Sequence, residues 1–166
     1  MNSSPLDSSL PLNDGLIRFI ESMGIYYEGY GIPRIGGRMM GLFLITTQAI
    51  SAEQIAELLD TSLSSVSTNV RALIANGWVE KVSFPGDRTT YFRFSPSAWE
   101  NVMERRRQGI LPLKALAEQA RSALPPDAPA QAQLSGMVEW ATVLISHYEA
   151  LITAWRTRRS EDPTEE

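Results

Sequence analysis

The chain has 166 residues, which is enough for one domain or for two closely joined subdomains with a buried core. It contains no cysteine, and this excludes disulfides, thiol nucleophiles and thiolate metal sites. The formal net charge of −4 argues against indiscriminate binding of nucleic acids, because neutralisation of phosphates supplies most non-specific affinity. Between Arg34 and Arg107, however, nine Lys or Arg outnumber seven Asp or Glu, and this local balance of +2 suits a site-specific binder.

The N-terminal residues are polar and interrupted by proline, so we expect a flexible arm over residues 1–12. This stretch lacks the basic and apolar regions of a signal peptide, and no run of the sequence is long enough to span a bilayer, which predicts a cytoplasmic protein. Residues 13–29 are predicted to form a helix that Asp14 caps, with an apolar face suited to dimerisation. That face consists of Leu16, Ile17, Ile20, Met23 and Tyr27.

A second helix is predicted to begin near Pro33, because the first turn of a helix does not need the N–H that proline lacks. Gly37 and Gly41, four residues apart, would let another backbone approach closely. Arg34 and Arg38 share a face of this helix, where they could contact the DNA backbone or pair with acids on a neighbouring helix. We favour the ion pairs, because paired arginines are the common case.

A helix-turn-helix is predicted from Ser51 onwards. Ser51 and Gln54 have the spacing of a capping box, and the turn-favouring residues 60–62 end this helix and start the next. The second helix has an apolar stripe for the core, made of Val66, Val70, Leu73 and Ile74. Its opposite side is almost free of acids and could enter a major groove. The predicted DNA contacts there are Ser64, Ser67, Thr68 and Arg71, with Ser65 on a flank. An ordinary amphipathic helix with a serine-rich surface is the alternative.

Two strands joined by a tight turn follow this helix. Residues 78–84 alternate loosely as a strand, and residues 88–94 return with β-branched and aromatic side chains. The turn between them presents Arg88 beside Asp87, and both are predicted DNA contacts of a wing. Residues 30–97 therefore have the outline of a winged helix-turn-helix DNA-binding domain.

Residues 98–159 are expected to form two long helices joined by a rigid, proline-rich loop. The first helix is expected to bend near Gly109 and Pro112, and the second to run from about residue 134 to residue 158. The apolar faces exceed what one small winged domain needs, so we assign this hairpin to dimerisation. The arginines at 105–107 are expected to form a solvated face, and residues 160–166 a disordered acidic tail.

Two runs of sequence together resemble a known family. The run SLSSVSTNVRALIANGWVEKV followed by PGDRTTYFRF resembles the recognition helix and wing of MarR-type regulators, and the upstream run GIPRIGGRMMGLFLI is similar to the GbsR branch of that group. The match spans roughly residues 30–99. It implies a mostly α fold with a small β-hairpin wing (α+β), in which a winged helix-turn-helix is joined to a helical dimerisation region. We therefore expect a homodimeric repressor that binds an imperfect palindrome in double-stranded DNA.

The resemblance also implies a small-molecule effector. GbsR-like relatives are known as repressors connected with osmoprotectant metabolism, which implies a choline-like compound. Aromatic ring faces can hold a quaternary ammonium, and Tyr27, Tyr30 and Trp99 form our predicted effector pocket. Most aromatic residues of the chain are nevertheless better explained by packing in the core or in a dimer interface.

An enzyme is the least expected class of protein. His147 is the only histidine, and the sequence suggests no nucleophile or orienting acid to act with it. There is no phosphate loop and no dinucleotide fingerprint, and we expect neither a cofactor nor a metal. The stronger rival is a winged helix that serves only as a protein-interaction module, without sequence-specific DNA binding.

Overall fold

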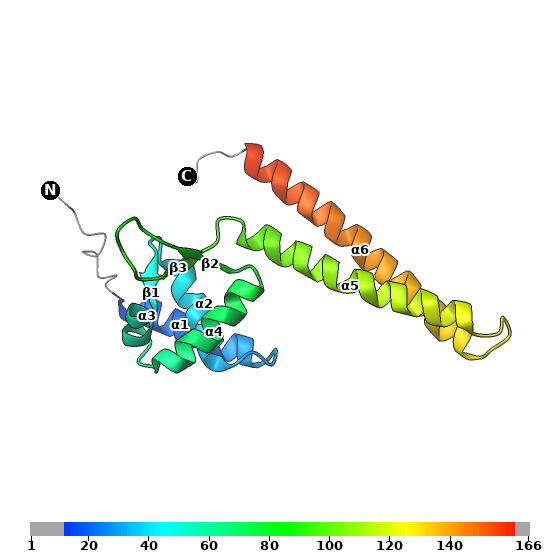
Figure 1. Cartoon of the computed structure of the whole chain (residues 1–166), viewed down its shortest axis with the longest axis horizontal. Coiled ribbons are helices and arrows are strands. Elements are labelled where there is room, and N and C mark those ends of the chain that lie inside the picture. Colours follow the sequence, from blue (N-terminus) through cyan, green and yellow to red (C-terminus); the bar gives the residue numbers. More distant parts are fainter. Residues whose placement is uncertain (1–11, 162–166) are drawn as a thin grey trace. The chain divides into compact units, whose positions relative to one another are not determined.

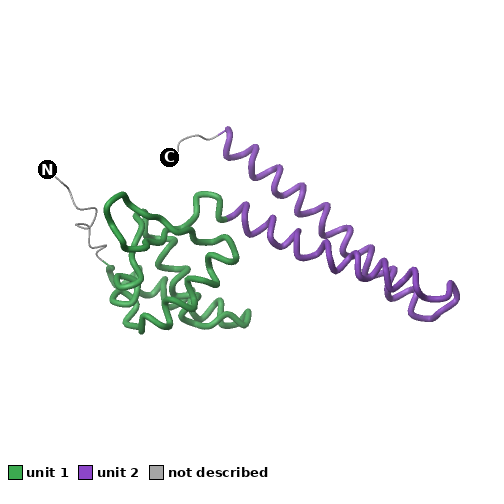
Figure 2. The backbone as a smooth tube through the Cα atoms, in the orientation of Figure 1, with its two compact units in different colours: residues 1–98 green, residues 99–166 purple. Residues whose placement is uncertain are grey.

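The computed structural model describes residues 12–161 of the chain. The chain divides into two compact units, residues 1–98 and residues 99–166 (Figure 2). Of the predicted N-terminal arm only Leu12 is described, and it packs partly buried against the core of the first unit. Of the predicted acidic tail, Ser160 and Glu161 are helical, and the remaining residues lie outside the described part.

The first unit is mostly helical with a small sheet, as predicted (Figure 1). Its elements in chain order are α1 (Asp14–Glu28), α2 (Arg34–Ile45), β1 (Ile50–Ser51), α3 (Ala52–Leu58), α4 (Leu63–Ala75), β2 (Val79–Val82) and β3 (Tyr91–Phe94). The core lies where α2, α3 and α4 meet. Its largest fully buried side chains are Met39, Leu42, Phe43, Ile55, Leu59 and Val66. Each such side chain stabilises the fold by about 1.5–3 kcal/mol relative to exposure.

Glycines let α1 and α2 cross closely, as the sequence predicted for Gly37 and Gly41. A Cβ atom added at Gly37 would lie 2.6 Å from the carbonyl oxygen of Met23 and 2.9 Å from the Cα of Gly24, both in α1. A Cβ atom added at Gly41 would lie 3.1 Å from the Cα of Ile20. The N-terminal helix is therefore packed backbone to backbone against the helix-turn-helix unit.

The capping residue predicted for α3 is confirmed, and the one predicted for α1 is wrong. Ser51 and Gln54 form the predicted capping box, with Gln54 N–H donating to Ser51 Oγ (3.2 Å) and Ser51 N–H donating to Gln54 Oε1 (2.8 Å). The prediction that Asp14 caps α1 is wrong, because Asn13 accepts the hydrogen bond from the Leu16 N–H (3.0 Å). Asp14 is instead the first helical residue, where its charge is favourable to the helix dipole.

The sheet is antiparallel with the strand order β1-β3-β2, and Tyr91 pairs with Val82 on one side and Ser51 on the other. Strand β1 was missed from the sequence, because it has only two residues and Ser51 also caps α3. The two wing strands are shorter than the predicted ranges of 78–84 and 88–94. Pairing stops early because the chain turns at Gly86, whose φ is +82°, and because the Thr89 N–H donates to the Asp87 side chain.

The second unit is a helical hairpin of α5 (Ala98–Ala123) and α6 (Ala130–Glu161). Helix α5 continues through Pro112, and α6 starts earlier and ends later than the predicted range of 134–158. The side-chain amide nitrogen of Gln131 lies 3.1–3.2 Å from the carbonyl oxygens of Arg121, Leu124 and Pro125, and its two N–H groups are shared among these acceptors at the C-terminal end of α5. Within the described residues, no helix is long and apolar enough to cross a membrane.

Ion pairs tie the two helices together near the ends that are far from the loop. Arg156 of α6 pairs with Glu100 of α5. Arg107 pairs with Glu104 on its own helix (2.6 Å) and with Glu149 on α6 (3.4 Å). Hydrogen bonds from Arg107 and Gln108 lower the pKa of Glu104 to about 2. Glu104 is therefore ionised at any pH near neutrality.

Candidate nucleic-acid interface

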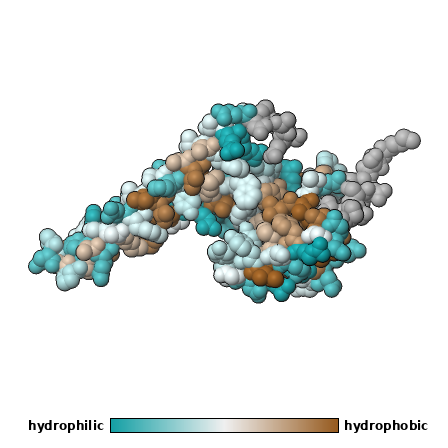
Figure 3. Space-filling view, turned by 180° about the vertical axis from the view of Figure 1, so that it is seen from behind, coloured by the Kyte–Doolittle hydropathy of each residue, from teal (hydrophilic) through white to brown (hydrophobic). Residues whose placement is uncertain are grey.

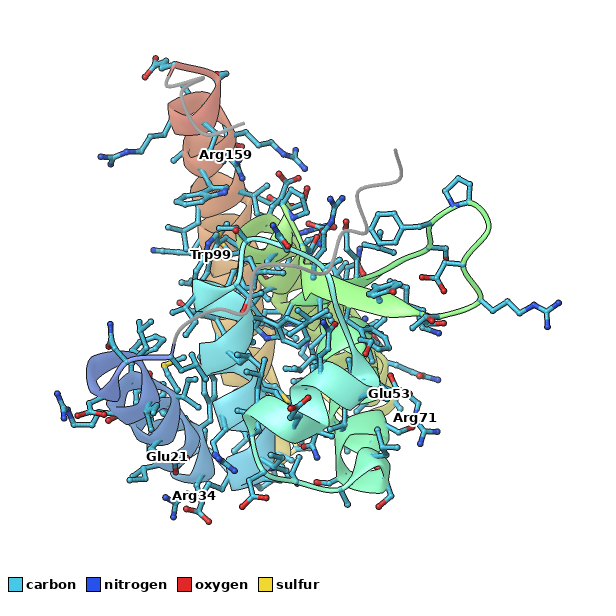
Figure 4. The ribbon with its side chains drawn as sticks, turned by 90° about the vertical axis from the view of Figure 1, so that its left-hand side faces the viewer. Glu21, Arg34, Glu53, Arg71, Trp99 and Arg159 are labelled. Carbon is cyan, nitrogen blue, oxygen red and sulfur yellow. The ribbon has the colours of Figure 1, made fainter. Side chains whose placement is uncertain are left out.

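Helix α4 presents the polar surface that the sequence predicted. Ser62 caps the helix by accepting from the Ser65 N–H (3.2 Å), and Val66, Val70 and Leu73 are buried beneath it. The opposite side is exposed and carries Ser64, Ser67, Thr68 and Arg71, a surface we call the reading face. Figure 4 shows Arg71 projecting from α4 at the molecular surface. Ser65, predicted on a flank, is half-buried.

The polar groups of the reading face are engaged with their own helix. Arg71 donates from Nε to the Ser67 carbonyl (2.9 Å) and from Nη2 to Ser67 Oγ (3.3 Å). Thr68 donates to the Ser64 carbonyl (3.0 Å), and the hydroxyls of Ser62 and Ser64 lie 3.0 Å apart. These groups are exposed, so exchanging such hydrogen bonds for new partners costs little. The Arg71 guanidinium is thus available to a ligand once it leaves Ser67.

Asn69 was missed from the sequence. It is buried on the inner side of α4, where its side-chain amide donates to the Ser65 carbonyl (2.9 Å). A Cβ atom added at Gly36 of α2 would lie 3.0 Å from Asn69 Oδ1. Asn69 therefore fixes how closely α4 packs on α2. The available signal was a polar residue three positions after Val66, within the stripe predicted to face the core.

The wing loop, residues 83–90, is exposed and is ordered by Asp87. The Asp87 N–H donates to the Phe84 carbonyl (3.1 Å). One carboxylate oxygen of Asp87 accepts from the Thr89 N–H (2.8 Å), and the other accepts from the Tyr91 hydroxyl (2.8 Å). These two hydrogen bonds hold the pKa of Asp87 below its usual range, and the bond to Asp87 raises the pKa of Tyr91. Asp87 is a carboxylate and Tyr91 a neutral phenol at neutral pH.

The second predicted residue of the wing, Arg88, lies between two anchored neighbours. Its side chain is exposed, and among the residues that the structure describes it has no hydrogen-bond or ion-pair partner. A free guanidinium at the end of a hairpin suits contact with a phosphate or with the minor groove.

Arg34 and Arg38 are engaged with Glu21 of α1, which supports the ion-pair interpretation over a DNA contact. Arg34 Nη2 lies 2.9 Å from Glu21 Oε2, and Figure 4 shows the two side chains together at one edge of the unit. Arg38 Nε lies 2.6 Å from Glu21 Oε1, an ion-pair distance, although its geometry is not that of a hydrogen bond. One carboxylate thus joins two arginines across the α1–α2 contact.

The residues of the predicted effector pocket are divided between the two units. Tyr27 and Tyr30 belong to the first unit, where both neighbour Tyr26, with ring centroids 5.3 Å and 5.1 Å from its ring. Tyr30 is 70% exposed. Trp99 is the first residue of the second unit and is partly exposed. The pocket therefore stays a prediction. Among the described residues there is no group of three or more His, Cys, Asp or Glu that could hold a metal ion.

Comparison with known proteins gives matches along most of the chain. Residues 30–88 match the model of the MarR family, and residues 97–158 match that of the MmpR5-like MarR family transcriptional regulators. The HTH-type transcriptional regulator MmpR5 of Mycobacterium tuberculosis (strain ATCC 25618 / H37Rv) is 37% identical over 117 residues, which are 70% of each chain. A crystal structure of a transcriptional regulator superposes with a TM-score of 0.78 and 29% identity, over 86% of this chain and 99% of the other.

Proposed function

The chain belongs to the MarR family of transcriptional regulators, and on this premise we propose that it is a homodimeric repressor that binds an imperfect palindrome in double-stranded DNA. The observation that carries the proposal is the reading face of α4, on which exposed hydroxyls and Arg71 stand without an acidic residue among them. Such a surface can approach phosphates and base edges without charge repulsion.

The reading face and the wing have different tasks in this proposal. Helix α4 enters the major groove, where Arg71 exchanges Ser67 for two acceptors on a guanine, and Ser64, Ser67 and Thr68 donate to phosphates or base edges. Ser65 contributes from the flank. The wing delivers Arg88 to the backbone or minor groove of the adjoining DNA.

We assign Arg34 and Arg38 to helix packing in this proposal. Moving either arginine to a phosphate would break an ion pair with Glu21, and the charge of Glu21 would then oppose the DNA. The DNA contact predicted for these two residues is therefore the weaker of the two expectations.

The second unit supports the proposal of a dimer. Large apolar side chains of the hairpin are exposed, among them Leu116 (62%), Trp140 (52%) and Leu151 (53%). Apolar patches interrupt the polar surface of the hairpin in Figure 3. A second copy that covers them would create a two-fold axis and place two reading faces on half-sites about 34 Å apart, or a multiple of that spacing. Sedimentation of the full chain tests this, and a monomeric mass at micromolar concentration contradicts it.

Binding to DNA is tested by selection from a library of random duplexes, followed by fluorescence anisotropy at several salt concentrations. We expect enrichment of a palindromic site. Arg71→Ala should cost about 1–3 kcal/mol at particular base pairs. Arg88→Ala should instead weaken binding to matched and scrambled duplexes alike and should flatten the salt dependence. If no duplex is enriched, the alternative of a protein-interaction module replaces the proposal. Repression itself is tested with a reporter whose promoter overlaps the selected site, where increased expression would contradict it.

We also propose that a small effector releases the DNA by binding the DNA-free form more tightly. We keep Tyr27, Tyr30 and Trp99 as the predicted effector pocket. A choline-like effector is expected only if the chain belongs to the GbsR-like branch of the family, which also stays a prediction. Thermal-shift screening of osmolytes and quaternary amines tests this, with each hit repeated in the presence of saturating operator. Coupling is reciprocal, so an inducer must bind more weakly when the operator is present. We also propose that the protein is cytoplasmic, because a DNA-binding repressor has to reach the genome.

A further inference from the structure

Both oxygens of the Asp87 carboxylate in the wing are engaged within the protein, which is not expected of a side chain that contacts DNA. Each oxygen of the Asp87 carboxylate accepts a hydrogen bond at 2.8 Å, one from the Thr89 N–H and one from the Tyr91 hydroxyl. The pKa of this group is lowered by those same bonds, so it carries a full negative charge at neutral pH. A carboxylate repels phosphates, and the base group that it suits is the amino group of cytosine.

Tyr91, whose hydroxyl donates to Asp87, is itself held rigidly in the sheet. Its side chain is 3% exposed, and its backbone is paired with Val82 on one side and Ser51 on the other. Its ring meets the Phe84 ring edge to face, with centroids 5.2 Å apart. The Tyr91 hydroxyl therefore holds Asp87 to the middle of the sheet, and Phe84 covers the start of the same loop.

Arg88 lies between the two residues that the Asp87 carboxylate connects. The backbone is held at Asp87 by the turn to Phe84 and at Thr89 by the carboxylate. The Arg88 side chain thus leaves from a fixed backbone while its guanidinium remains free. A group that is ordered before binding loses less conformational entropy when it binds.

We propose that Asp87 is a positioning residue of the wing, which together with Tyr91 holds the loop in the form that presents Arg88 to DNA, and that it does not itself contact a base. This inference rests on the proposed DNA-binding function and deepens it. Two consequences follow from the geometry. Removing the Tyr91 hydroxyl should have the same effect as removing the carboxylate, and neither removal should matter once Arg88 is gone.

The first arm of the experiment needs no DNA. Amide hydrogen exchange of Thr89 is measured in the full chain for the wild type, Asp87→Ala and Tyr91→Phe. We expect the two variants to exchange about tenfold faster at Thr89, because the loop opens more often. Asp87 is exposed, so Asp87→Ala should leave the unit folded, with a modestly lower Tm because the hydroxyl of the buried Tyr91 loses its acceptor. Unchanged exchange at Thr89 in both variants would overturn the positioning role whatever the DNA results are.

The second arm is a double-mutant cycle on the most enriched duplex from the random library. Asp87→Ala, Tyr91→Phe and Arg88→Ala should each weaken binding by about tenfold or less, with Asp87→Asn between the wild type and Asp87→Ala. Adding Asp87→Ala to Arg88→Ala should then weaken binding by less than about twofold. Asp127→Ala, which removes an exposed acid from the hairpin loop, is the control for net charge.

The possible results separate the two proposals. If the effects of Asp87→Ala and Arg88→Ala multiply, Asp87 acts independently and the positioning role is wrong. It is also wrong if Asp87→Ala and Asp87→Asn both tighten binding beyond the Asp127→Ala control, because Asp87 is then only a repulsive charge. If Thr89 exchange responds but no duplex is enriched, the DNA-binding function fails and the positioning of Arg88 for DNA fails with it.

Discussion

The glycine crossing between α1 and α2 predicts that Gly37→Ala destabilises the protein, although alanine is the better helix former. The added Cβ would lie 2.6 Å from the Met23 carbonyl oxygen, 2.9 Å from the Gly24 Cα and 3.0 Å from the Tyr27 Cβ. Real Cβ atoms essentially never lie within 3.0 Å of a heavy atom from a residue that is not their neighbour in the chain, and the two shortest contacts here are to backbone. Backbone atoms cannot rotate away, so α1 itself has to move.

The size of the effect follows from two opposing contributions. Replacing glycine by alanine in a helix stabilises it by about 1 kcal/mol. Overpacking a close contact typically costs about 1–3 kcal/mol and occasionally more, and displacement of a whole helix belongs at or above the upper end of that range. The net loss should be about 2 kcal/mol. For a domain of this size that corresponds to a fall in Tm of roughly 10 °C.

Gly109 in α5 is the matched control. A Cβ there meets nothing within 4 Å, so Gly109→Ala keeps only the favourable contribution and should stabilise the hairpin by up to about 1 kcal/mol. Both variants are compared with the wild type by thermal and urea unfolding, followed by far-ultraviolet circular dichroism. A Gly37→Ala variant as stable as the wild type, or two alanine variants that change stability in the same direction, would show that the contact at Gly37 does not restrain α1.

Two further predictions concern the hairpin. Gln131→Ala should destabilise it by about 1–2 kcal/mol and speed amide exchange near the end of α5, because the two N–H groups that three carbonyls share are lost; unchanged urea unfolding would contradict this. The pKa of Glu104 is about 2 in the folded chain, below its ordinary value of 4.5, so its contribution is present above pH 4.5 and is lost as the pH falls toward 2. The Tm should therefore fall more steeply across that window in the wild type than in Glu104→Gln, and equal slopes would refute the assignment.

The sequence predicted the helix-turn-helix and its polar face because these depend on local signals. Capping at Ser51 and the apolar stripe of α4 are set by residues within one or two turns of each other, and both were confirmed. The close approach at Gly37 was also predictable. Two glycines four residues apart in a helix lie on one face, where the missing Cβ atoms let another backbone approach. The partner of that approach is the α1 backbone at Met23 and Gly24, which precedes the turn between the helices and could not be identified from spacing alone.

The features that were missed depend on the tertiary structure. Strand β1 exists only because β3 lies beside it, and two residues of sequence carry no strand signal. The wing strands were predicted too long because Asp87 was interpreted as a turn residue, and its bonds to Thr89 and Tyr91 cannot be derived from composition. The sequence predicted that Arg34 and Arg38 pair with acids on a neighbouring helix, but it could not identify that acid as Glu21 of α1, which pairs with both arginines.

The double role of Ser51 limits which segments of such a protein can be exchanged with those of another protein. Its backbone is paired with Tyr91 at the base of the wing, and its side chain caps α3, the first helix of the helix-turn-helix. A chimera that exchanges only residues 79–94 would set a foreign strand against the original Ile50–Ser51 edge, and any shift in register there would also pull on the start of α3. A transplanted wing therefore has to bring residues 50 and 51 with it, so the smallest exchangeable segment includes α3 and α4 as well.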